Sequence, residues 1–293
     1  MPDRALQLLR TWLDRQLPDS GRSWLAEQLD RVAADPSLRN LQIAFGMVPR
    51  KLGKLDLELN DADLAQAAEA RPGWQPQSWS VDMAARVLII TTAGRASNEF
   101  HRSFVNLCRH ADVAEAVALY SGLPLYPEQQ ALEPQVGEGL RTNMRAIFEA
   151  IAHNNPYPKE HFDENRWNHM VLKALFVESS LYPIQGLDQR ANPELARILR
   201  DYAHERWAAS RPVTPELWRC IGPFTDGEVL TDLDRLVSSS NALEKQAAAL
   251  ALNASSSEQA KLRLSSMSAE TMAIANGQLS WDQVGLDHAN STK

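Results

Sequence analysis

Three ionisable side chains in the second half of the chain have the types and the spacing that acid–base chemistry uses. In the segment DYAHERW, His204 follows Asp201 by three positions and Glu205 follows it by four, so a helix places all three on one face. A carboxylate can orient a histidine ring and stabilise its protonated form, which suits the ring to accept or donate protons. One interpretation is therefore an enzyme with His204 as the acid or base and Asp201 or Glu205 as its partner.

The same face also has a structural interpretation. Two carboxylates one helical turn apart repel each other, and an arginine, a metal ion or a proton could offset that repulsion. The arginines that could form an ion-pair network with these acids are Arg190, Arg197 and Arg211. We assign no metal and no cofactor, because no other histidine stands at a metal-ligand spacing from a second donor.

Polar and aromatic residues are dense around this segment, between residues 141 and 219. Trp167 and Asn168 stand inside an apolar helical pattern, where a buried asparagine needs hydrogen-bond partners. Asp188 and Arg190 precede a capped helix start, so they either tie the loop to that helix or present charges to a ligand. The sequence leaves both alternatives open.

Motifs with a fixed catalytic or nucleotide-binding spacing are missing from the chain. It has no glycine-rich phosphate-binding loop, no HExxH zinc helix, no GxSxG nucleophile turn and no CxxC pair. This absence favours a non-catalytic protein. Active sites can also be assembled from scattered residues, so whether the protein is an enzyme stays open.

The elements that must position these residues are helices. Apolar residues recur every three to four positions from Leu6 to Leu17 and again from Trp24 to Ala33, a period typical of amphipathic helices. The run 87–92 is rich in β-type residues but has no turn signal before it, so we predict a buried helix there. Further helices are predicted at about 37–48, 61–71, 80–93, 97–109 and 112–121.

The C-terminal third is predicted to contain paired helices. Residues 228–253 indicate two short amphipathic helices, the second rich in alanine, like one unit of a HEAT-like repeat. Asn192 and Thr214 each precede a proline and an acid, and Thr225 precedes Glu228 by three positions, which predicts three helix starts. The predicted fold class is all-α, with a multi-helix superhelical arrangement.

Domain organisation is indicated by the segment GLPLYPEQQALEPQVG at 122–137, since its prolines block a continuing helix. We expect it to divide an N-terminal helical region, residues 1–125, from a C-terminal helical region, residues 135–285. The polar end, residues 286–293, is predicted to be a disordered tail.

Composition and charge narrow the class of protein. The 293 residues carry 30 basic and 37 acidic side chains, a formal charge of −7 without a basic cluster, which disfavours nucleic acids and anionic membranes as partners. No stretch has the length and apolarity of a membrane span, and the N-terminus lacks a signal-peptide pattern. With only two cysteines, Cys108 and Cys220, these features predict a cytoplasmic protein without direct membrane insertion.

Four segments resemble the EboA domain family of bacteria. They are VALYSGLPLYP, EGLRTNM, NPYPKEHFDENRWNHMVLKALF and GLDQRANPELARILRDYAHERWAASRPVTPELWRCIGPF, and the similarity spans residues 110–225, with a looser similarity on both sides. The resemblance implies an all-α, superhelical protein encoded in ebo clusters, beside a prenyltransferase-like membrane protein and proteins resembling metal-dependent hydrolases or isomerases. Such clusters are associated with making or exporting specialised metabolites.

The resemblance implies no catalytic residue, but it does imply a shared candidate surface. The matching positions include Asn155 and Arg206 and the candidate ligand-binding residues, which are Arg141, Asn143, Trp167, Asn168, Lys173, Asp188, Arg190, Asn192, Asp201, His204, Glu205, Trp218 and Arg219. His169 departs from the family pattern, which has glutamine after the Trp-Asn pair, so a metal role for it would not be a family property.

The leading hypothesis is a non-catalytic helical scaffold or small-molecule-binding accessory protein of an ebo-type cluster. Its predicted partners are other ebo-cluster proteins or a small-molecule intermediate, because stacked helix pairs expose an extended concave surface. The alternative is an enzyme acting on a prenylated, aromatic or sugar-like intermediate through His204 and Asp201 or Glu205. We expect the candidate residues to gather around one solvent-reachable hollow.

Overall fold

The computed structural model describes residues 2–97 and 99–291. These residues form helices joined by short connections and contain no strand, and an isolated antiparallel bridge joins Asp56 to Ser80. The predicted all-α class is therefore confirmed, while the HEAT-like superhelical arrangement stays a prediction. Every helix in the described ranges is too short or too polar to cross a lipid bilayer.

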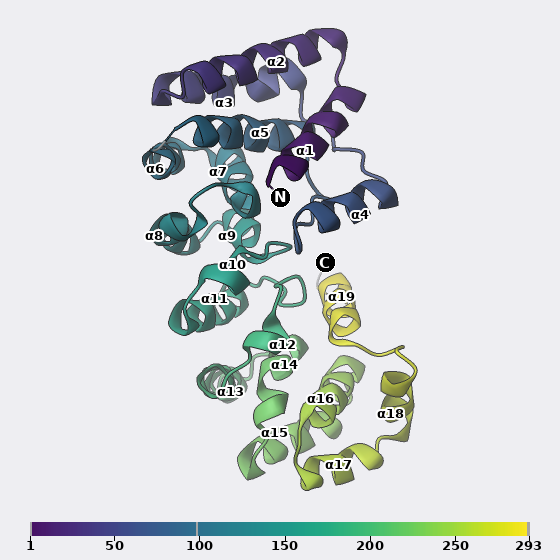
Figure 1. Ribbon diagram of the computed structural model, residues 1–293. Coiled ribbons are helices and arrows are strands. Elements are labelled where there is room, and N and C mark those ends of the chain that lie inside the picture. The colour runs from purple at the N-terminus through teal and green to yellow at the C-terminus, as the bar shows by residue number, and fades with distance from the viewer. Residues whose placement is uncertain (1, 98, 292–293) are drawn as a thin grey trace. The chain divides into compact units, whose positions relative to one another are not determined.

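The chain forms two compact units, Met1–Asp163 and Glu164–Lys293. The helices of the first unit (Figure 1) are α1 (Pro2–Gln16), α2 (Asp19–Ala34), α3 (Leu38–Leu52), α4 (Asp61–Ala70), α5 (Val81–Ala96), α6 (Phe100–His110), α7 (Val113–Ser121), η1 (Leu123–Leu125), α8 (Gln129–Leu140), α9 (Arg145–Ala152) and α10 (Tyr157–His161). The helices of the second are α11 (Glu164–Phe176), α12 (Leu187–Arg190), α13 (Pro193–Ala208), η2 (Pro215–Leu217), α14 (Trp218–Ile221), η3 (Gly222–Phe224), α15 (Gly227–Val237), α16 (Ala242–Ala254), α17 (Glu258–Ser265), α18 (Ser268–Ala275) and α19 (Trp281–Ser291).

The proline-rich segment 122–137 lies inside the first unit rather than at a boundary. Pro124 belongs to the short helix η1, which follows α7 directly. Leu123, Leu125 and Tyr126 are all buried in the core of this unit. Helix α7 ends at Ser121, before Pro124, as expected, but Pro134 lies inside α8 and does not interrupt it. The apolar residues of the segment keep the connection packed in a single core.

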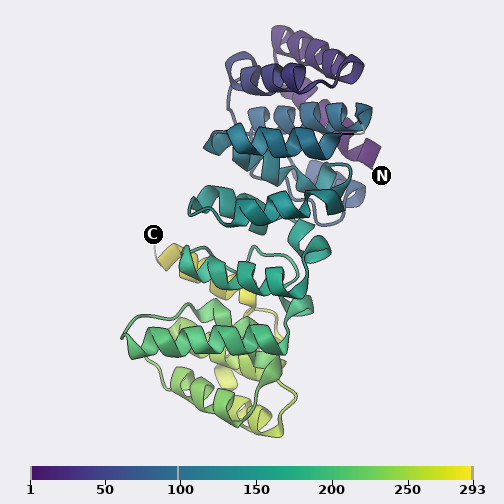
Figure 2. The same ribbon diagram turned by 90° about the vertical axis from the view of Figure 1, so that its left-hand side faces the viewer.

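Helix α5 is the centre of the first unit. It packs against α1, α2, α3 and α7, and the two views in Figures 1 and 2 show α2 and α3 on one side of it and α7 on the other. The predicted helix over 87–92 is confirmed, because a helix covered on all sides tolerates apolar residues around its whole circumference. The hydroxyl groups of Thr91 and Thr92 donate to carbonyls four residues earlier, at 2.6 and 2.8 Å.

A buried arginine joins α5 to its neighbours. Only 3% of Arg86 is exposed, and its guanidinium lies 3.0 Å from Asp82 in the same helix and 3.7 Å from Glu115 of α7. Its Nε donates to the carbonyl of Phe45 in α3 at 3.3 Å. A buried charge needs such partners, so the contacts of Arg86 hold α3, α5 and α7 together.

Helix α16 is the centre of the second unit, where it packs against α14, α15, α17 and α19. Its alanines at 247, 248, 249 and 251 are fully buried, and their small side chains let neighbouring backbones approach. A Cβ atom added to Gly222 of η3 would lie 2.7 Å from the Cα of Ala251. The two helices predicted over 228–253 are confirmed as α15 and α16.

The predicted helix starts agree with the structure in part. Asn192 caps α13 by accepting a hydrogen bond from the backbone N–H three residues later, at 2.8 Å. A helix begins after Thr214 as predicted, the short helix η2, but the Thr214 side chain makes no capping hydrogen bond. Asp226 rather than Thr225 caps α15, because the Thr225 hydroxyl donates to a carbonyl three residues earlier at 2.6 Å.

The C-terminal end continues as helix through residue 291, where a disordered tail was expected from residue 286. Helix α19 packs against α16 and η2 and buries Val284. His288 contributes a further contact, with its Nε2 3.0 Å from the Thr214 hydroxyl. These contacts with distant parts of the chain order a polar segment. Residues 292–293 of the predicted tail lie outside the described residues.

Candidate functional site

The three residues of the DYAHERW segment lie in α13 as predicted, but they have different surroundings. Asp201 forms an ion pair with Arg197 at 2.7 Å, which the structural interpretation anticipated, and Glu205 is exposed. His204 Nε2 lies 3.0 Å from a carboxylate oxygen of Asp232 in α15. The acid beside His204 is therefore Asp232, which belongs to another helix and gave no signal in the local spacing.

Four other candidates come together where α11, α12 and α13 meet. The side-chain amides of Asn168 and Asn192 exchange hydrogen bonds of 2.8 and 3.2 Å. The Arg190 guanidinium lies 4.7 Å from the centre of the Trp167 ring, a cation–π distance. Asn168 is buried and Trp167 is fully buried, so these contacts hold the α12 loop against two helices.

Asp188 and Arg219 form a charged pair at the end of α12. Two hydrogen bonds of 2.7 Å join the guanidinium to the carboxylate, and Asp282 of α19 lies 3.2 Å from the same guanidinium. The hydrogen bonds from Arg219 lower the pKa of Asp188. This contact ties three segments of the second unit together.

The remaining candidates lie in separate environments. Burial lowers the pKa of Lys173 in α11, and Trp218 is almost fully buried. In the first unit, Arg141 forms an exposed ion pair with Glu138 at 2.9 Å, and Asn143 is exposed. Most candidates thus have local partners of their own, and ligand binding by them stays a prediction.

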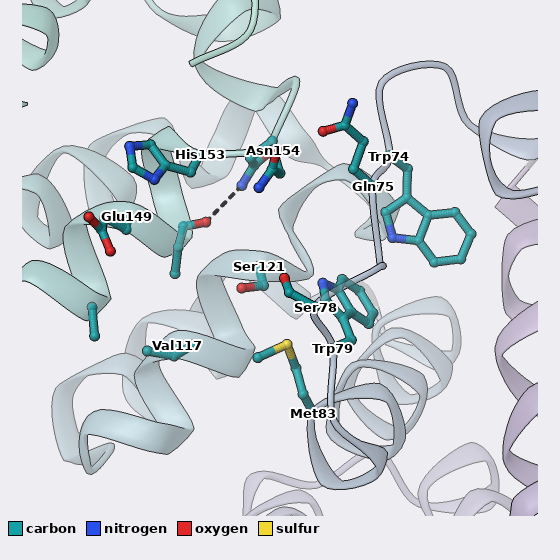
Figure 3. Close-up of a pocket in the computed structure, with 13 residues that line it drawn as sticks. Trp74, Gln75, Ser78, Trp79, Met83, Val117, Ser121, Glu149, His153 and Asn154 are labelled. Atoms are coloured by element: carbon teal, nitrogen blue, oxygen red, sulfur yellow. Dashed lines mark hydrogen bonds between the residues drawn. The ribbon is translucent and has the colours of Figure 1, made fainter. Parts of the chain in front are cut away.

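A pocket of the first unit has features of a small-molecule site that the sequence did not indicate. Its volume is about 270 Å³, just below the range of about 300–1,000 Å³ for small-molecule pockets. The walls come from the connection between α4 and α5, from α7, and from α9 with the turn after it (Figure 3). We call it the tryptophan pocket, after Trp74 and Trp79 on the connection.

The connection that carries the two tryptophans is held in place by backbone and ring contacts. The carbonyl of Trp79 accepts a hydrogen bond from the N–H of Leu57 at 2.8 Å, beside the isolated bridge. The Trp74 ring lies 5.5 Å from the ring of Trp12 in α1 and 5.8 Å from that of Trp79. Both pocket tryptophans are at least nine-tenths buried, so they form a preorganised wall.

The indole N–H of Trp74 has no hydrogen-bond partner among the described residues, although the nitrogen is buried. Figure 3 shows this nitrogen on the side of the ring that faces the other lining residues. A buried donor without a partner costs about 1–3 kcal/mol. A ligand with a hydrogen-bond acceptor would recover that free energy if a small shift of the neighbouring side chains brought the acceptor to this buried nitrogen.

The opposite wall is fixed by Asn155, one of the positions that match the family pattern. Its side-chain amide donates to the carbonyl of Tyr120 and to that of Ala150, both at 3.1 Å, and the second bond is the dashed line in Figure 3. Its oxygen accepts from the N–H of Tyr157 at 3.0 Å. Asn154 can therefore adopt the left-handed conformation, with φ of 52°, in a well-anchored turn.

The tryptophan pocket carries little net charge. Among the described residues that line it, Glu149 is the one carboxylate, and Arg145 lies 2.7 Å from it. The other polar side chains are neutral or weakly basic, and they include Gln75, Ser78 and His153. Such a lining suits an uncharged, flat molecule with polar edges, which would stack on indole rings and form hydrogen bonds at its rim.

One observation in the sequence could have indicated this pocket. The segment PGWQPQSW places two tryptophans, one between prolines and one shortly after them, in a connection between predicted helices.

Among residues 2–97 and 99–291, no group of three or more His, Cys, Asp or Glu side chains is close enough to hold a metal ion.

The structure is that of an all-α protein with a pocket in its first unit. A family model described as "Metabolite traffic protein EboA" matches residues 5–222. The chain therefore belongs to the EboA family, and the description indicates a role in metabolite handling. Neither the curated proteins nor the solved structures searched contain a match to this chain.

Proposed function

We propose that this protein is a non-catalytic accessory protein that binds an uncharged, flat metabolite in the tryptophan pocket. The single observation that carries the proposal is the buried Trp74 N–H, which lies on the pocket side of its ring and has no partner among the described residues. The low net charge of the lining supports an uncharged ligand, and the family description supports a metabolite. The whole pocket lies within the residues that match the family.

The proposal extends to the partners and the location of the protein. The resemblance to proteins of ebo clusters supports an intermediate of such a cluster as the ligand and the cluster enzymes as partners that deliver or receive it. Two cysteines that form no disulfide support a reducing compartment, so we place this activity in the cytoplasm. Affinity purification from the producing bacterium should recover at least one cluster protein.

The binding step can be tested with two small flat molecules of similar size. Quinoline offers a ring nitrogen that accepts a hydrogen bond, whereas indole offers only a donor. We expect quinoline to shift the Trp74 indole N–H resonance in a proton–nitrogen NMR spectrum and indole to bind more weakly. Trp74→Phe keeps an aromatic ring but removes the donor, so quinoline should bind about 3–10-fold more weakly to it, the value of one hydrogen bond.

Trp24→Phe is the matched control, because Trp24 lies in α2 of the same unit and does not line the pocket. Equal binding of quinoline and indole, or unchanged quinoline affinity of Trp74→Phe, would contradict the proposed site.

The non-catalytic part of the proposal needs a separate measurement. Protein incubated with an extract of the producing cells should release its ligand unchanged when it is denatured, as mass spectrometry can determine. A product that forms only with active protein would instead support an enzyme. Loss of that product in His204→Ala would then assign His204, with Asp232 as its partner, to the reaction.

A further inference from the structure

A second pocket, in the second unit, differs in chemistry from the tryptophan pocket and shares no residue with it. Its volume is 470 Å³, and its walls come from the end of α13, the connection after it, α14, the end of α15 and the start of α16. We call it the arginine pocket. The residues that decide its chemistry are Trp207, Arg211, Trp218, Arg235 and Glu244.

Two stacked tryptophans form the apolar wall of the arginine pocket. The Trp207 and Trp218 rings lie 5.7 Å apart, with an interplanar angle of 24°. Trp218 is only 1% exposed, and the His204 ring contacts Trp207 edge-on at 5.3 Å. Trp207 is held by these contacts and is only partly buried, so its exposed part offers a fixed aromatic surface to a ligand.

Two exposed guanidinium groups stand beside this aromatic wall. Arg235 lies 4.2 Å from the centre of the Trp207 ring, and Arg211 lines the same pocket. Neither group forms an ion pair with a described carboxylate, whereas Arg200 and Arg219 of the same unit do. The protein therefore holds two cations at an aromatic surface without neutralising them directly.

Glu244 of α16 is the carboxylate of this lining. Two guanidinium groups and one carboxylate leave a single positive charge in excess. A ligand with one negative charge balances it, whereas a phosphate dianion would face repulsion from Glu244. Guanidinium groups bind a carboxylate through paired hydrogen bonds, which adds geometric selectivity.

We propose that the arginine pocket binds a flat carboxylate with one negative charge, such as an aromatic acid. The ring of the ligand packs against the exposed part of Trp207, and its carboxylate accepts hydrogen bonds from Arg211 and Arg235. This site stands independently of the tryptophan pocket, so the protein offers one site for an uncharged flat molecule and one for an anionic one.

Calorimetric titration of the full chain with three phenyl compounds tests the proposal. Benzoate carries one negative charge, benzamide has nearly the same shape without charge, and phenyl phosphate approaches two charges near neutral pH. We expect benzoate to bind with a Kd near or below about 1 mM and the other two at least about fivefold more weakly. Benzoate should shift the indole resonances of Trp207 and Trp218 and leave that of Trp74 unchanged.

Substitutions at the charged residues test whether the arginine charges, rather than nonpolar contacts alone, account for the benzoate affinity. Arg235→Gln and Arg211→Gln should each weaken benzoate binding about tenfold, the loss expected for one charge-assisted hydrogen bond. Glu244→Gln should bring the affinity for phenyl phosphate closer to that for benzoate, because it removes the carboxylate that repels a dianion. Arg197→Gln is the matched control, since Arg197 is an exposed arginine of α13 that does not line the pocket, and it should bind benzoate normally.

Three results would overturn the proposal. They are benzamide affinity within about threefold of that of benzoate, unchanged benzoate affinity in both arginine variants, and no saturable binding up to about 10 mM benzoate, where a Kd of a few millimolar is still measurable. Different tryptophans report on the two pockets. A negative result with benzoate therefore does not contradict the proposed function of the tryptophan pocket, and a negative result with quinoline does not contradict the proposal for the arginine pocket.

Discussion

Glu216, at the start of the 3₁₀ helix η2, is a buried carboxyl group with an unusual charge environment. It is only 2% exposed, and burial raises its pKa from an ordinary 4.5 to about 6. Hydrogen bonds donated by the backbone N–H groups of Leu181 and Tyr182 offset part of the burial. The folded protein therefore holds a proton at Glu216 at pH values where the unfolded chain has released it.

This shift predicts a pH dependence with a definite sign. The stabilisation from protonated Glu216 is fully present below about pH 4.5 and is lost as pH rises through about 6, with a total of about 2 kcal/mol. Glu216→Gln cannot ionise, so its free energy of unfolding relative to the wild type should increase by about that amount between pH 4.5 and 7.5. Urea titrations at both pH values measure this difference.

Comparison with the wild type removes the effect of the other carboxyl groups, whose titration is common to both proteins. A difference between the two proteins that does not change with pH would show that Glu216 has an ordinary pKa.

At the scale of helices, one asparagine both begins α13 and joins it to α11. Asn192 caps the helix and exchanges hydrogen bonds with buried Asn168. Asn192→Ala removes the cap, worth about 1 kcal/mol, and leaves a buried amide without its partner, worth about 1–3 kcal/mol. Chemical denaturation should show a loss of about 2–4 kcal/mol.

Asn241→Ala provides the matched control, because Asn241 caps α16 but is exposed. It should lose only the cap contribution of about 1 kcal/mol. Equal losses in the two variants would mean that the Asn168–Asn192 pair contributes little to stability.

Substitution of two glycines in the second unit tests how closely its helices pack against one another. A Cβ at position 222 would lie 2.7 Å from backbone atoms of Ala251, whereas a Cβ at position 227 would have no neighbour within 4 Å. Gly222→Ala should therefore destabilise the unit by more than about 2 kcal/mol, since backbone cannot move aside cheaply. Gly227→Ala, at the start of α15, should be neutral or stabilising by up to about 1 kcal/mol. Thermal denaturation of both variants measures the contrast.

At the scale of the whole molecule, each compact unit contains one unpaired cysteine. Burial raises the pKa of Cys108 in the first unit and of Cys220 in the second to about 12. The thiolate is the reactive form, so both groups should react very slowly with a thiol reagent at pH 8 in the folded protein. Each becomes reactive when its own unit opens.

Labelling across a urea series, followed by mass spectrometry of the two cysteine peptides, then reports the unfolding of the units separately. Coincident midpoints would indicate one cooperative transition, and separate midpoints two. Rapid labelling of either cysteine without urea would contradict its predicted protection.

The fold class and the positions of many helices follow from the amino-acid sequence alone. The helix over 87–92, the α15–α16 pair and the Asn192 cap could be predicted, because periodicity and capping depend on residues a few positions apart. The family resemblance and its motifs were also visible in the sequence, and the family match confirms them.

Which side chains meet depends on how the helices pack in three dimensions. His204 faces Asp232 rather than Asp201 or Glu205, the segment 122–137 belongs to the first core, and α19 is ordered by α16 and η2. The two tryptophans of the 71–80 connection face a wall supplied by α7 and α9. Each of these contacts joins residues far apart in the sequence. They are stabilised by burial of apolar surface and by hydrogen bonds and ion pairs between helices, which a local sequence pattern does not encode.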